Sequence, residues 1–277
     1  MYPTGGNVEV LSPFQVGSLR ILIASLVLLP VSLKYLKLLS RRNTGYLLIS
    51  GLAGNFIPAF LFTLAETHID SSLAGLLNMS TTFFVTLIGI FVYRVFPSRY
   101  QLAGLLLGSI GLYLVLYQQI DFSAGDLSYA LLVILATICY AISLTTIKFK
   151  LGNLPSLAIT SLSFFLILFP AAIACLFFNS FSPVFSHPDG FRSIGYLSIL
   201  SVVGTAVAVV LFTRLIAISS HIFSSAVAYV LPVVAVFLGV LDGDVFHPVN
   251  LIWIAIIFTG VYLMNKKQKN TKKAGAA

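Results

Sequence analysis

Charged residues are scarce in this chain. Only 9% of its 277 residues are Asp, Glu, Lys or Arg, whereas 58% are hydrophobic. A soluble domain carries about 25% charged residues, so the composition excludes an ordinary soluble protein. It is typical of a protein that crosses a membrane many times.

Cysteine and catalytic motifs are also rare. The two cysteines, Cys139 and Cys175, both lie in hydrophobic runs, so they indicate neither a disulfide framework nor a zinc site. The sequence lacks HExxH, GxSxG and P-loop motifs, and its four histidines fall in loops or at the ends of the runs. We therefore expect no enzyme activity, no metal site, no cofactor and no ATP-driven pump.

Hydrophobic runs occupy most of the chain. A membrane-spanning helix needs about 20 apolar residues, and nine runs approach or exceed this length. The runs are 15–39, 45–67, 71–93, 102–118, 127–147, 154–178, 193–215, 222–241 and 248–264. They predict an all-α polytopic membrane protein with short loops. Gly104, Gly108 and Gly111 in the fourth run predict a seam where another helix packs closely.

The positions of the charges predict the orientation. If the C-terminus is cytoplasmic, 14 of the 16 Lys and Arg residues lie on the cytoplasmic side, and all eight Asp and Glu residues lie on the other. An excess of Lys and Arg in cytoplasmic loops sets membrane topology. We expect a multi-pass plasma-membrane protein, in a bacterial inner membrane, whose chain begins on the extracytoplasmic side. The same rule explains the net charge of +8, so we expect no nucleic-acid partner.

The two halves of the chain resemble each other. "GNFIPAFLFT" (54–63) matches "GTAVAVVLFT" (204–213) at an offset of 150 residues, and the charge pattern makes the two segments run in opposite directions. An inverted repeat of this kind is typical of secondary transporters. It predicts a first half of four helices (1–120), a second half of five helices (127–265) and a basic cytoplasmic tail (266–277).

The run at 127–147 has no counterpart in the first half. A repeat of five plus five helices would begin one helix earlier. We therefore expect that the first helix of the repeat is missing from this sequence.

Two helical hairpins resemble a known family. "FTLAETHIDSSLAGLLNMSTTFF" (62–84) and "LFTRLIAISSHIFSSAVAYVLPVVAVFLG" (211–239) are similar to corresponding hairpins of the EamA-type transporters of the drug/metabolite transporter (DMT) superfamily. The resemblance implies a ten-helix fold built from two inverted five-helix units, of which nine helices are present, and transport of small metabolites. The absent first helix and the sequence "LDGDVFHP" (241–248) depart from the family pattern.

Polar residues within the runs are the candidate substrate-binding residues. Transporters with inverted repeats bind substrate near the middle of the membrane, where the halves meet. The candidates are Asn55, Pro58, Phe62, Glu66, Asn78, Thr81, Thr82, Tyr140, Thr205, Tyr229 and Pro232. Packing between helices is the alternative role for the hydroxyl groups. The amides of Asn55 and Asn78 need several partners each and point more strongly to a cavity.

The sequence predicts a secondary transporter that moves a small metabolite or drug-like solute by alternating access, as an exporter. Its expected partners are a small-molecule substrate and the lipid bilayer. The alternative is a non-catalytic accessory or scaffold subunit. Substrate identity, coupling ion and oligomeric state stay open.

Overall fold

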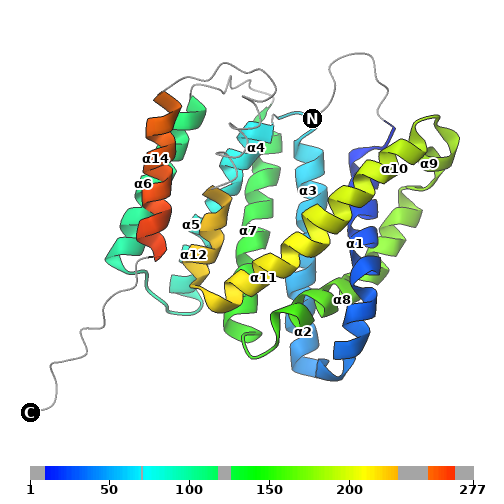
Figure 1. The fold of residues 1–277 in the computed structure, drawn as a ribbon, viewed down its shortest axis with the longest axis horizontal. Helices are drawn as coiled ribbons and strands as arrows, with labels where there is room; N and C mark the ends of the chain where they lie inside the picture. Colours follow the sequence, from blue (N-terminus) through cyan, green and yellow to red (C-terminus); the bar gives the residue numbers. More distant parts are fainter. Residues whose placement is uncertain (1–9, 70, 118–125, 230–248, 266–277) are drawn as a thin grey trace, which may run out of the picture.

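The computed structural model describes residues 10–69, 71–117, 126–229 and 249–265, and these ranges contain helices but no strand (Figure 1). The first half contains α1 (Pro13–Tyr35), η1 (Leu36–Leu38), α2 (Arg41–Gly51), η2 (Leu52–Phe56), α3 (Ile57–Ala65), α4 (Ser71–Asn78), α5 (Ser80–Phe91) and α6 (Arg99–Tyr117). The second half contains α7 (Asp126–Lys150), α8 (Ser156–Phe177), α9 (Ser182–Ser186), α10 (Gly190–Ile199), η3 (Leu200–Val207), α11 (Ala208–Ile218), α12 (His221–Ser225), η4 (Ala226–Tyr229) and α14 (Val249–Asn265).

Six helical segments in the described ranges are long and apolar enough to cross a membrane. They are Pro13–Leu38, Arg41–Ala65, Leu73–Phe91, Leu127–Lys150, Ser156–Phe177 and Gly190–Ile218. Large apolar side chains also cover their outer surfaces: Phe177 is 80% exposed and Phe91 is 78% exposed. Helices that are apolar on every side belong in lipid. This confirms an all-α polytopic membrane fold.

Three of the nine predicted runs, at 102–118, 222–241 and 248–264, are not among these six segments. The runs at 102–118 and 248–264 correspond to α6 and α14, which are also apolar. The run at 222–241 begins in α12 and η4, and its later part lies outside the described residues.

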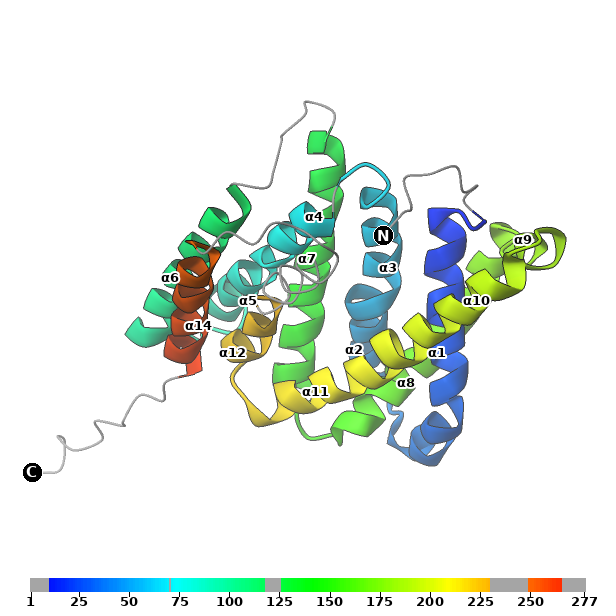
Figure 2. The same ribbon diagram turned by 45° about the horizontal axis from the view of Figure 1, so that its top comes forward.

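The inverted repeat is visible in the direction of two long segments. The segment α2–η2–α3 and the segment α10–η3–α11 run in opposite directions through the bundle (Figures 1 and 2). Each contains a π-helical segment that includes one of the aligned glycines, Gly54 in η2 and Gly204 in η3. A π-helical segment within an α-helix is rare and often marks a functional position.

Equivalent helices of the two halves pack against each other. α1 lies along α8, and α6 lies along α14. A Cβ atom added to Gly260 would lie 2.6 Å from the backbone nitrogen of Gly108, and one added to Gly104 would collide with the carbonyl oxygen of Gly260. The predicted glycine seam therefore lets the backbones of α6 and α14 touch.

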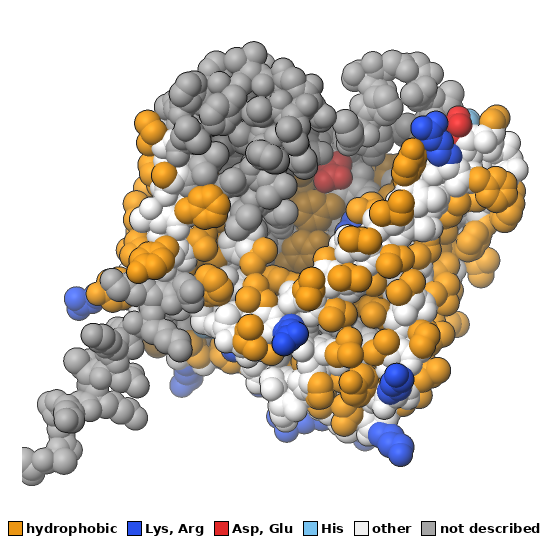
Figure 3. Space-filling view, in the orientation of Figure 1, with side chains coloured by type: hydrophobic (Ala, Val, Ile, Leu, Met, Phe, Trp, Pro, Cys, Tyr) orange, Lys and Arg blue, Asp and Glu red, His pale blue; other side chains and the backbone are white. Residues whose placement is uncertain are grey.

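The charges divide the bundle into two ends. Lysine and arginine side chains gather along the lower edge in Figure 3, where α1 leads into α2, α7 into α8 and α11 into α12. We call this the basic end. The opposite end, which we call the acidic end, carries Glu66, which directly follows α3, and Asp189, which directly precedes α10. This division places the basic residues of these connections at one end, as the charge pattern predicts.

Candidate functional site

A cavity of about 510 Å³ lies between the two halves of the repeat. Its wall comes from α1, the α2–η2–α3 segment, α7, α8 and the η3–α11 segment, with single residues from α4, α5, α12 and η4. In the space-filling view it forms a hollow near the acidic end, with an acidic side chain at its rim (Figure 3). A concave, mostly apolar site with a few polar groups is typical of a small-molecule site.

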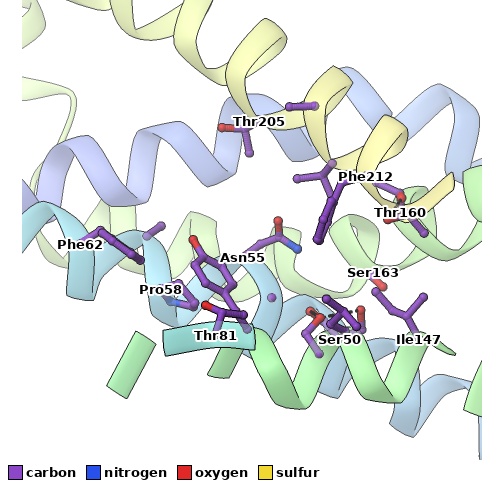
Figure 4. A pocket seen from close by; sticks show the side chains of 18 of the residues that line it. Ser50, Asn55, Pro58, Phe62, Thr81, Ile147, Thr160, Ser163, Thr205 and Phe212 are labelled. Atoms are coloured by element: carbon purple, nitrogen blue, oxygen red, sulfur yellow. Dashed lines mark hydrogen bonds between the residues drawn. The ribbon is translucent and has the colours of Figure 1, made fainter. Parts of the chain in front are cut away.

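Eight of the eleven candidate residues line this cavity. They are Asn55, Pro58, Phe62, Glu66, Asn78, Thr81, Tyr140 and Thr205. Figure 4 shows Asn55 and Thr205 on facing segments of the wall, one from each half. Their role in substrate binding stays a prediction.

Three candidates lie elsewhere. Thr82 is fully buried within α5, because neighbouring residues of a helix are about 100° apart and Thr81 is the one that faces the cavity. The hydroxyl groups of Tyr229 and Ser109 in α6 are 3.1 Å apart, and the Tyr229 ring is buried in the hydrophobic cluster beside α14. Neither Thr82 nor Tyr229 lines the cavity, and Pro232 lies outside the described residues.

Asn55 has an unused carboxamide. The π-helical segment η2 carries it into the cavity, where its side chain makes no hydrogen bond to any residue that the structure describes. Asn78 differs, because Oγ1 of Thr81, which donates to the backbone carbonyl of Asn78 over 2.6 Å, also lies 3.4 Å from its Oδ1. A primary amide has two donor hydrogens and an acceptor oxygen, so Asn55 can bind a polar group of a solute.

Hydroxyl groups that the sequence did not single out also line the cavity. They belong to Ser50, Thr63, Ser143, Thr160, Ser163, Thr213 and Ser225. Ser143 donates to the carbonyl oxygen of Ser50 over 3.1 Å, and Thr160 donates to Thr213 over 2.9 Å. These bonds join helices, which is the usual role of hydroxyl groups in membranes. In the sequence such residues look like packing residues, so only the helical spacing of Thr160 and Ser163 hints at a shared face.

Aromatic rings form part of the apolar wall. The rings of Phe62 and Tyr140 are stacked with centroids 5.9 Å apart, and Phe212 lies on the α11 side of the cavity (Figure 4). These flat apolar surfaces can contact the hydrocarbon part of a solute.

Arg20 lines the cavity but was not among the candidate residues that the sequence predicted. The charge pattern predicts it on the extracytoplasmic side of the run 15–39; it lies within α1, and its Nε donates a 2.7 Å hydrogen bond to Oγ1 of Thr205. The available signal was an arginine inside a hydrophobic run, because ionisable residues in membrane spans are usually functional.

Glu66 brings a carboxyl group to the same cavity. It directly follows the span Arg41–Ala65, and burial raises its pKa, while the charge of Arg20 acts in the opposite direction. No ion pair joins Glu66 to Arg20 in the described structure, so each can interact with a solute.

Comparison with known proteins gives one family. The EamA-like transporter family profile matches residues 5–117 and 127–266. No curated protein matches the chain. Among solved structures, 29 chains are similar. One of these, described as "Crystal structure of protein", is 17% identical with a TM-score of 0.70, and the match covers 94% of this chain and 89% of that chain. A likeness at this identity supports the fold alone.

Proposed function

Because this chain belongs to the EamA-like transporter family and is a multi-pass membrane protein, we propose that it exports a small amphipathic metabolite by alternating access. One observation carries the proposal: a cavity between two inverted halves is lined by polar groups from both halves. Rocking of one half against the other would expose such a cavity to each side of the membrane in turn.

The charge division supports an orientation for this proposal. By the positive-inside rule, the basic end faces the cytoplasm and the acidic end faces outward. The cavity extends from Glu66 at the acidic end to Ile147 and Ile216 near the basic end. The C-terminus is then cytoplasmic, and the membrane is the plasma membrane, which in a bacterium is the inner membrane.

We assign solute binding to the cavity wall. Asn55 and Asn78 supply amides, Phe62 and Tyr140 supply apolar surface, and Thr205 lies on the facing half. Pro58 and Thr81 complete the same wall, and Glu66 lies toward the acidic end. Few polar groups on an apolar wall fit a small solute that has both a polar group and a hydrocarbon part.

The proposed function is tested by measuring the release of solutes from liposomes that contain the protein. Purified protein is placed in liposomes loaded with a metabolite extract, and the metabolites released are identified by mass spectrometry. We expect release of one class of solute that disappears in the Asn55→Leu, Asn78→Leu double variant. The matched control is Asn153→Leu, which removes an exposed amide outside the cavity.

Two results would contradict the proposal. Release that is equal in the double variant would exclude the cavity as the transport site. Absence of release from the folded, unaltered protein would instead favour the accessory-subunit alternative, especially if flux returns when a partner protein is added.

A further inference from the structure

We propose that Arg20 is the anion-binding group of the cavity and that the transported solute carries one carboxylate on an apolar body. This inference rests on the proposed function, because it takes the cavity to be the substrate site. It assigns a chemical class to a solute that the family alone leaves undefined.

The surroundings of Arg20 leave most of its hydrogen-bonding groups free. A guanidinium group has five N–H donors, and the Nε donor alone is used, by Thr205 at 2.7 Å. The two terminal Nη groups make no hydrogen bond or ion pair with the residues that the structure describes. A half-buried cation within a membrane helix is costly unless it has a partner or contacts water, and here the Nη groups have the cavity beside them.

The hydrogen bond to Thr205 also orients the group. Arg20 belongs to the first half and Thr205 to the second, so the bond fixes the guanidinium plane between the halves. A fixed planar guanidinium binds a carboxylate through two parallel hydrogen bonds, which is stronger and more directional than a single contact.

Glu66 limits the charge of the solute. It lines the same cavity, toward the acidic end, and its carboxylate repels a second negative charge on a bound molecule. The pair therefore favours a monoanion over a dianion. The stacked rings of Phe62 and Tyr140 supply the surface for the apolar body.

Three matched probes test this assignment. They are 3-phenylpropanoate (a monocarboxylate), 3-phenylpropanamide (its neutral analogue) and phenylsuccinate (a dicarboxylate). Binding to the purified full chain is measured by calorimetry and by the rise in unfolding temperature that a ligand produces. We expect the monocarboxylate to bind at least about tenfold more tightly than either other probe, since loss of a charge-assisted pair has an effect of that size.

Variants of Arg20 test whether this residue causes the preference for the monocarboxylate. Arg20→Gln should abolish the preference for the monocarboxylate, and Arg20→Lys, which keeps the charge but not the planar fork, should retain part of it. Arg192→Gln is the matched control, because Arg192 is an exposed arginine at the acidic end outside the cavity. Size-exclusion chromatography establishes whether each variant is folded. If Arg20→Gln does not fold, Arg20→Lys still tests the assignment.

The possible results separate this inference from the proposed function. Equal binding of the acid and the amide, a preference that survives Arg20→Gln, or no binding of any probe at millimolar concentration overturns the inference. If the monocarboxylate binds through Arg20 but no solute crosses liposomes, transport fails and the anion site stands. If a neutral solute crosses and Arg20→Gln leaves its flux unchanged, transport stands and the anion site fails.

Discussion

The ammonium group of Lys148, near the end of α7, donates a 2.9 Å hydrogen bond to the carbonyl oxygen of Ile216 in the last turn of α11. The same group donates to the carbonyl oxygens of Ala217 and Ser219. A cation at a helix C-terminus satisfies carbonyl groups that have no partner within the helix. Lys148 therefore ties α11 to α7 at the basic end.

Lys148→Met should loosen this connection. The variant leaves three carbonyl oxygens without their cation, and because Lys148 is half-buried we expect a loss of roughly 1 kcal/mol. That loss corresponds to a fall of about 2–4 °C in the apparent unfolding temperature in detergent. Lys37→Met is the control, because Lys37 is exposed at the same end. An equal shift in both variants would show that only the charge of the basic end matters.

His221 should make stability depend on pH. It begins α12, its Nε2 is buried without a partner among the described residues, and burial together with the charge of Lys148 lowers its pKa from 6.5 to about 4. Between these values the unfolded chain binds more protons, so the folded state is fully stable above pH 6.5 and loses stability as the pH falls toward 4. The loss has an upper limit of about 1.4 kcal/mol per pH unit.

The measurement is the unfolding temperature between pH 7 and pH 4.5. We expect His221→Leu to flatten the curve over this range and His187→Leu, which changes a less buried histidine, to leave the curve unchanged. A curve that keeps its slope in His221→Leu would assign the pH dependence to other groups.

Gly260→Ala should disrupt the contact between α6 and α14. The added methyl would lie 2.6 Å from the backbone nitrogen of Gly108, which cannot move aside as a flexible side chain can. Overpacking of this kind lowers stability by about 1–3 kcal/mol. Gly195→Ala is the matched control, because nothing lies within 4 Å of the added atom there. We expect a lower unfolding temperature for Gly260→Ala alone, and equal values would remove close packing as the reason for these glycines.

Thr205→Val should separate the orientation of Arg20 from its charge. The variant removes the acceptor of the 2.7 Å hydrogen bond from Nε but keeps the guanidinium in the cavity. We expect 3-phenylpropanoate to bind several-fold more weakly and 3-phenylpropanamide to bind as before. Thr259→Val, which changes an exposed hydroxyl of α14, is the control. A loss of both probes together would show that Thr205 shapes the cavity as a whole.

The sequence predicted the parts of the fold that follow from hydropathy and charge. Long apolar runs had to be membrane helices, and the alternation of Lys and Arg with Asp and Glu predicted which ends of them share a side. Residues at helical spacing, such as Asn55, Pro58 and Phe62, could be placed on one face, and the structure finds them on one wall.

Other features depended on contacts between helices. Tyr229 occupies the middle of a run, as Asn55 does, but it packs against Ser109 of α6, which no local pattern indicates. Arg20 was assigned to the extracytoplasmic side by charge alone, and its contact with Thr205 of η3 depends on how the two halves pack. The π-helical segments leave no trace in hydropathy, because they change the hydrogen-bonding register and keep the side-chain types.

The two π-helical segments differ in length: η2 covers Leu52–Phe56, whereas η3 covers Leu200–Val207. In the alternating-access transport that we propose, the opposite-facing state would arise if each half took the shape that the other half has here. The first half would then contain the longer π-helical segment, and the second half would contain the shorter one. During this change, residues of η3 would return to α-helical hydrogen bonding and residues next to η2 would become π-helical.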